Sequence, residues 1–134
     1  MKDFQTYLDE DKVKKQSANH GEARSLRVQA VTRFEQQVQN NEINSKNSTF
    51  IFEDAYESLR QYLQSFMAEN GYKPYSHEAI ISYSLENEKL SKSEANKLDQ
   101  FRKLRNDIRY RGETSNQQKA KLIKQLAKKK LPID

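Results

Sequence analysis

Three of the four arginines and the asparagine within residues 101–112 are spaced in a way that suits anion binding. Arg105 and Arg109 are four residues apart, so a helix would bring their like charges together at a cost of about 0.2–0.5 kcal/mol. A nearby anion would relieve this repulsion, and the planar guanidinium group binds phosphate through paired hydrogen bonds. An arginine-rich helix is also often a solvated surface. We predict phosphate binding, in RNA or a nucleotide, at Arg102, Arg105, Asn106 and Arg109.

A second cationic group lies close to the C-terminal end. Residues 101–134 carry 11 basic and 3 acidic side chains, a net charge of +8, whereas residues 1–100 carry a net charge of −3. Lys121, Lys124 and Lys128 follow helical spacing and would form a stripe that attracts the phosphates of a nucleic acid. A solvated helix face and cations that complement a helix C-terminus are the alternatives. The apolar face beside the lysines is short, so membrane binding is not expected.

Composition excludes several kinds of chemistry. The chain has no cysteine, so disulfides, thiol nucleophiles and thiolate metal sites are ruled out. Its three glycines are too scattered for a phosphate-binding glycine loop, and its two histidines are too few for a multi-histidine zinc site. We therefore expect no metal and no cofactor. No apolar run approaches the length of about 20 residues that a membrane helix needs, and the first residues lack a secretory pattern, so a cytoplasmic location is expected.

The fold class follows from glycine and proline content and from the apolar spacing. Few glycines and prolines encode few turns, which favours long helices. Apolar residues recur at helical intervals in several segments, and no segment alternates with a period of two. We predict one all-α domain over residues 1–134, an antiparallel up-and-down bundle with a four-helix core and additional N- and C-terminal helices.

Start and stop signals give approximate helix ranges. Ser91 and Glu94 form a capping-box pattern, and Gly112 follows the apolar stripe of the helix that begins there. Phe50 and Leu122 are expected on apolar helix faces. The predicted helices cover residues 3–15, 22–41 and 47–70, a short stretch after Ser76, residues 92–111, and a basic helix within about 114–131 that follows a second capping pattern.

The Arg105-Asn106 pair, followed by an aromatic residue and Gly112, resembles the signature segment of the HEPN superfamily. The segments 51–60 and 71–78 are similar to the second core helix of that family and to the connection after it. The resemblance covers about residues 22–112. It implies a four-helix core, a homodimer, and kinship with ribonucleases, toxins of toxin–antitoxin systems and partners of minimal nucleotidyltransferases.

Active members of the family carry a histidine a few residues after the arginine. The corresponding positions here hold Tyr110 or Arg109. A metal-independent ribonuclease needs a proton-transfer group with a pKa near neutrality, which tyrosine and arginine ordinarily lack. The leading hypothesis is therefore a HEPN-like protein that binds RNA or a nucleotide-bearing partner without cleaving it. The family tyrosine that nucleotidyltransferases modify would fall at Gly112, with Tyr110 nearby.

Two other functions remain open. One is a metal-independent ribonuclease that uses Arg105 with a displaced base, either His77 or Tyr110. The other is a non-catalytic interaction module, in which Arg105 and Asn106 hold the protein together by pairing with acidic residues of an earlier helix. The acidic residues considered for that pairing are Glu53, Asp54 and Glu57.

Overall fold

The computed structural model describes residues 1–133 and shows a helical fold, which confirms the all-α prediction. The two strands that it contains are three residues long each. In chain order the elements are α1 (Phe4–Asp9), β1 (Val13–Lys15), α2 (His20–Phe34), the π-helical turn η1 (Glu35–Gln39), α3 (Ser48–Glu69), β2 (Tyr72–Pro74), α4 (His77–Glu86), α5 (Lys92–Arg111) and α6 (Gln117–Lys130).

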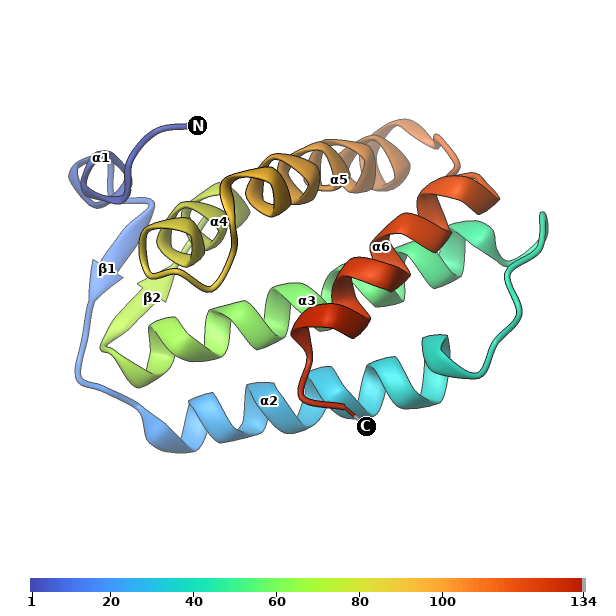
Figure 1. Cartoon of the computed structure of the whole chain (residues 1–134). Coiled ribbons are helices and arrows are strands. Elements are labelled where there is room, and N and C mark those ends of the chain that lie inside the picture. Colours follow the sequence, from blue (N-terminus) through green and yellow to red (C-terminus); the bar gives the residue numbers. More distant parts are fainter. Residues whose placement is uncertain (134) are drawn as a thin grey trace.

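Helix α3 is the central element, and α2, α4, α5 and α6 all contact it. Figure 1 shows α2 and α3 side by side in opposite directions. Helices α4 and α5 lie on the side of α3 away from α2, and α6 crosses α3 obliquely. Phe52, Leu59, Leu63 and Met67 of α3 are almost completely buried. In general, a helix that is surrounded by other helices carries apolar residues on most of its faces. This central position brings side chains of α3 to every other layer of the protein.

Two helix ends follow the sequence signals closely. The Ser91 hydroxyl accepts a hydrogen bond from the Glu94 backbone N–H, and the Glu94 carboxylate accepts one from the Ser91 N–H, which completes the capping box. Gly112 ends α5 with a left-handed φ of 69°. Gly71, just after α3, has a φ of 81°, and a Cβ there would lie 2.6 Å from the carbonyl oxygen of Gln16. Glycine is required at this second position for both reasons.

The prediction for residues 3–15 is wrong beyond Asp9. Asp11 adopts a left-handed φ of 58°, which ends the helical path, and residues 13–15 then pair antiparallel with residues 72–74. Asn19 caps α2 through its side chain, so this helix begins at His20 rather than at residue 22. Strands of three residues are too short for an alternating pattern to be detected.

Two apolar residues are not where the spacing places them. Phe50 is 67% exposed and Leu122 is 44% exposed, whereas Ile123 and Ala127 of α6 are fully buried. The last helix is capped by the side chain of Asn116, two residues after Thr114. Within residues 1–133, no helix has both the length and the apolar character needed to cross a membrane.

The start of α5 is joined to the end of α6 by a buried carboxylate. Glu94 accepts from Lys130 Nζ at 2.7 Å and lies 3.1 Å from Lys129 Nζ. Burial alone would raise the pKa of Glu94, but hydrogen bonds from Lys130, from the Ser91 backbone and from Lys129 outweigh it and lower the pKa to about 2. The charged form of Glu94 therefore stabilises the folded protein.

We expect Glu94→Gln to lower the free energy of unfolding by about 1–3 kcal/mol at neutral pH, because glutamine retains the cap but not the two ion pairs. The folded-state pKa lies below the ordinary value of 4.5, so the stabilisation is complete above that value and is lost as the pH falls towards 2. Urea unfolding of both proteins at several pH values measures the difference. The exposed Glu35→Gln serves as control, and an equal difference at low and neutral pH would contradict the assignment.

Candidate functional site

The candidate site lies where α3, α4 and α5 meet. Tyr56, in the middle of α3, is buried, and its hydroxyl oxygen is 3.1 Å from Nδ1 of His77, the first residue of α4. The guanidinium carbon of Arg105, on α5, is 6.0 Å from the centre of the Tyr56 ring. The distance is at the limit for a cation–π contact. Tyr56 therefore connects a histidine and an arginine that are far apart in the sequence.

Two surface hollows meet at Arg105, which lines both. The first encloses about 300 Å³ and includes His77, Arg105 and Asn106. The second encloses about 260 Å³ and includes Arg105 and Arg109. The remaining lining residues are Tyr75, Ser76, Glu78 and Arg102 in the first, and Arg33, Glu53, Asp54 and Glu57 in the second. The structure thus brings together all four residues of the predicted arginine and asparagine group and adds His77 to them.

The arginines differ in how far their charge is compensated. Arg102 is 13% exposed, donates to Asp99 at 2.9 Å and lies 3.5 Å from a Glu78 oxygen. Its guanidinium group is therefore already held by two carboxylates. For Arg105 and Arg109, no carboxylate of residues 1–133 lies within 4.0 Å. These two carry the charge that remains available to an anion.

None of the three acidic residues proposed as partners of Arg105 forms an ion pair with it. Glu53 lines the same hollow as Arg105 without an ion pair among the described residues. Asp54 pairs with Arg33 at 3.3 Å, and Glu57 pairs with Arg60 on its own helix. Burial would raise the pKa of Glu57, but the hydrogen bond from Arg60 and the charges of Arg60, Arg33 and Arg105 lower it overall. Arg105 acts on Glu57 through its charge, without an ion pair between them.

His77 is held in its neutral form. Burial, followed by the positive charges of Arg60 and Arg105, lowers its pKa to about 4, and the nearby Glu57 opposes this only in part. Burial raises the pKa of the Tyr56 phenol, so its hydroxyl keeps its proton. At neutral pH the site therefore contains an uncharged imidazole between cationic side chains. Such a ring can donate and accept hydrogen bonds without repelling an anion.

The start of α4 borders the first hollow. Ser76 is the N-cap residue, and its side chain makes no capping hydrogen bond. Ser76, His77 and Glu78 line the hollow that Arg105 and Asn106 also line, so the positive end of the α4 dipole lies beside it. Glu78, in the first turn of α4, weakens this field, but its carboxylate accepts from the Tyr7 hydroxyl at 3.0 Å and is close to Arg102.

The predicted lysines form a separate group. Lys121, Lys124 and Lys128 line another hollow, of about 410 Å³, together with residues 41–43, and no residue is common to it and the two arginine hollows. The Lys124 ammonium group donates to the Asn41 carbonyl at 3.3 Å. Burial and the neighbouring Lys128 lower the pKa of Lys124. The two cationic groups predicted from the sequence are thus distinct surfaces.

The two candidate bases have different positions. Tyr110 is 78% exposed near the end of α5 and lines none of these hollows, whereas His77 lies beside Arg105. The sequence analysis did not identify the link between Tyr56 and His77. The signal available was the tyrosine in a predominantly apolar stripe, because a buried tyrosine hydroxyl needs a hydrogen-bond partner.

Comparison of the chain with family models, curated proteins and solved structures finds no match. Among residues 1–133, histidine and carboxylate side chains form no group of three or more that could hold a metal ion. The chemistry of the site therefore has to be inferred from its own side chains.

We expect Arg105→Met to raise the pKa of His77, because the substitution removes one of the positive charges that lower it. NMR titration of the imidazole signals in both proteins measures the shift. Arg24→Met, a change at an exposed arginine of α2, is the matched control and should leave the titration unchanged. An unchanged His77 titration in the Arg105 variant would show that the two groups are not coupled.

Proposed function

We propose that this protein binds RNA through phosphate contacts at the surface formed by His77, Arg105, Asn106 and Arg109, without cleaving it. The observation that carries the proposal is the Arg105 guanidinium group, which lines two hollows and lacks a carboxylate within ion-pair distance among residues 1–133. Arg105 is half-buried, so its charge is only partly hydrated, and an entering phosphate would compensate that charge. The Asn106 amide and the start of α4 supply further donors.

The HEPN resemblance adds partners to this proposal. By that analogy the protein would form a homodimer and act in the cytoplasm with a nucleotidyltransferase or within a toxin–antitoxin pair. The cationic groups support an anionic partner because residues 101–134 carry a net charge of +8. The Lys121, Lys124 and Lys128 surface would contribute long-range attraction and additional phosphate contacts.

We expect wild-type protein to retard tRNA in electrophoretic mobility assays, with affinity falling steeply between about 50 and about 200 mM salt. Arg105→Gln should weaken binding and reduce the slope of log affinity against log salt by about 1. Arg24→Gln is the control for charge alone.

Thermal unfolding of the same variants distinguishes binding from a structural role. Arg105→Gln should leave the melting temperature nearly unchanged, whereas Arg102→Gln should lower it because Asp99 and Glu78 lose their partner. Unchanged tRNA binding by the Arg105 variant, together with a large loss of stability, would favour the interaction module instead.

A second candidate function, metal-independent ribonuclease activity, is favoured by the position of His77 in the same hollow as Arg105 and Asn106. The imidazole would take the proton of a 2′-hydroxyl, whose oxygen attacks the adjacent phosphorus. The bond from phosphorus to the 5′-oxygen breaks, this oxygen takes a proton from water, and the hydroxide that forms takes the proton back from the imidazolium. For Nε2 to act as the base, Nδ1 must carry its hydrogen and donate it to Tyr56.

For this second candidate we expect RNA fragments with 2′,3′-cyclic phosphate ends in the presence of a chelator, and His77→Gln should reduce their formation by about 100-fold or more. His20→Gln, at the other histidine of the chain, is the control. Because the pKa of His77 in the protein without ligand is about 4, kcat/KM should show no loss attributable to its protonation between neutral pH and pH 5. Equal activity of the His77 variant and wild type would exclude this mechanism.

A further inference from the structure

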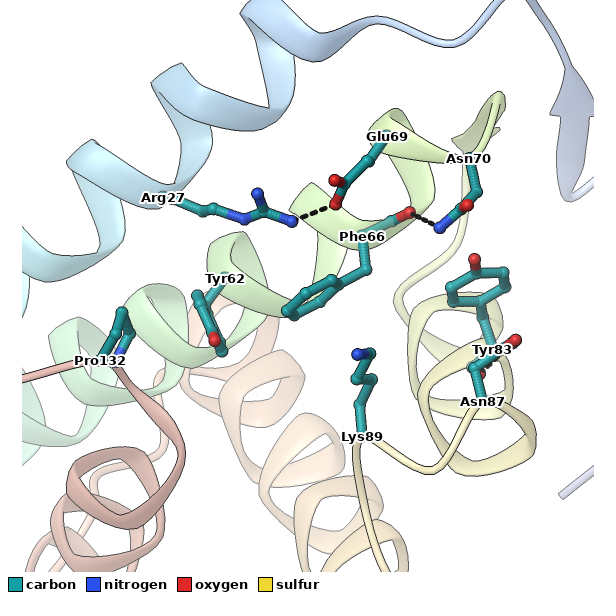
Figure 2. Close-up of a pocket in the computed structure, with 9 residues that line it drawn as sticks. All are labelled: Arg27, Tyr62, Phe66, Glu69, Asn70, Tyr83, Asn87, Lys89 and Pro132. Carbon is teal, nitrogen blue, oxygen red and sulfur yellow. Dashed lines mark hydrogen bonds and ion pairs between the residues drawn. The ribbon is translucent and has the colours of Figure 1, made fainter.

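A separate groove lies between α2, α3 and the connection from α4 to α5, and it encloses about 730 Å³ (Figure 2). This volume is within the range of small-molecule sites. Phe66 on α3 lines the groove, and Glu57 lines the arginine hollow. They are nine residues apart, about two and a half helical turns, so they point to opposite sides of α3. The groove is therefore distinct from the proposed RNA surface.

Three of the residues that line the groove are aromatic: Tyr62, Phe66 and Tyr83. The Tyr62 and Phe66 rings are in edge contact, with centres 5.1 Å apart and planes at 81°. Tyr83 of α4 lines the opposite side, and Figure 2 shows its ring across the groove from Phe66. Tyr62 and Phe66 are only partly buried. The Tyr62 ring borders the groove without a cation over it among the described residues, and a planar ligand can pack against it.

Two cations point to the same ring. Lys89 Nζ is 4.2 Å from the centre of Phe66, and the guanidinium carbon of Arg27 is 4.7 Å from it. Arg27 is oriented by a 2.9 Å hydrogen bond to the Ser65 hydroxyl and by an ion pair with Glu69. Lys89 has no carboxylate within 4.0 Å in the part of the chain that the structure describes. Its charge is available to a ligand.

The backbone fixes the base of the Lys89 side chain. Glu88 adopts a φ of 60°, a conformation that non-glycine residues rarely adopt. This turn allows the Lys89 N–H to donate to the Ser84 carbonyl at 2.8 Å, and the Leu90 N–H donates to the same oxygen at 3.1 Å. The ammonium group is therefore presented from an ordered turn rather than from a long flexible loop.

We propose that this groove binds a small ligand that combines a planar ring with an anionic group, as a nucleoside monophosphate does. The ring would lie against the aromatic lining, and Lys89 with Arg27 would hold the anion. Oε2 of Glu69 pairs with Arg27, whereas Oε1 makes no hydrogen bond within the described residues and can accept from ligand hydroxyls. A cationic ligand is disfavoured by the two cations, and a purely aliphatic anion would leave the rings unused.

Isothermal titration of the full chain with AMP, adenosine and inorganic phosphate tests this proposal. AMP should bind saturably and more tightly than either fragment, because only AMP engages both the rings and the cations. Lys89→Gln should weaken AMP binding by about tenfold, and Phe66→Leu should weaken both AMP and adenosine binding. Lys97→Gln, at an exposed lysine of α5, is the matched control.

Arg105→Gln separates this groove from the proposed RNA surface, since it should leave AMP binding unchanged whether or not tRNA binding is lost. Melting temperatures of all variants verify folding before binding is compared. The proposal is overturned by any of three results: no saturable AMP binding, phosphate binding as tight as that of AMP, or equal AMP affinity in wild type and the Lys89 variant. AMP binding that is abolished by Arg105→Gln and retained by Lys89→Gln would place the ligand on the other side of α3.

Discussion

The hydrogen bond between Tyr56 and His77 is the interaction on which the candidate site depends. The Tyr56 side chain of the central helix α3 is buried, and a buried hydroxyl without a hydrogen-bond partner would destabilise the folded protein. Bonding to His77 satisfies the hydroxyl and at the same time fixes the start of α4 against α3. Arg105 then approaches the same ring from α5. Tyr56 thus contacts side chains of two other helices, His77 of α4 and Arg105 of α5.

The burial of α3 on nearly all sides explains why polar contacts concentrate along it. Some of its polar side chains bond to neighbouring helices, as Gln61 does with Gln29 and Ser65 does with Arg27. Side chains that are paired in this way have little charge or hydrogen-bonding capacity left for a ligand. Arg105 and Lys89 stand out because each lies beside α3 and has no carboxylate within ion-pair distance among residues 1–133. What distinguishes the two candidate ligand surfaces is a positive charge that is not paired with a carboxylate among the described residues.

Local signals in the sequence were sufficient for most of the helices and insufficient for the site. The capping box at Ser91 and the left-handed Gly112 depend only on residues a few positions apart, so they were predictable. The short β1–β2 pairing and the contact between Tyr56 and His77 join residues far apart in the chain, and no local pattern encodes them. The helical spacing correctly grouped Arg105 with Arg109, but it could not show that Arg102 is already paired.

The same cations that would attract a phosphate also determine the protonation state of His77. Without a ligand, burial and the positive charges of Arg60 and Arg105 keep the imidazole neutral. A phosphate that enters beside Arg105 brings negative charge and therefore reduces the part of the pKa shift that is due to those cations. By linkage, any such rise in the pKa of His77 requires that phosphate binds more tightly to the protonated form. Binding and proton uptake are thus coupled at this site, and a cleaving enzyme would have to limit that coupling, because a protonated His77 cannot act as a base.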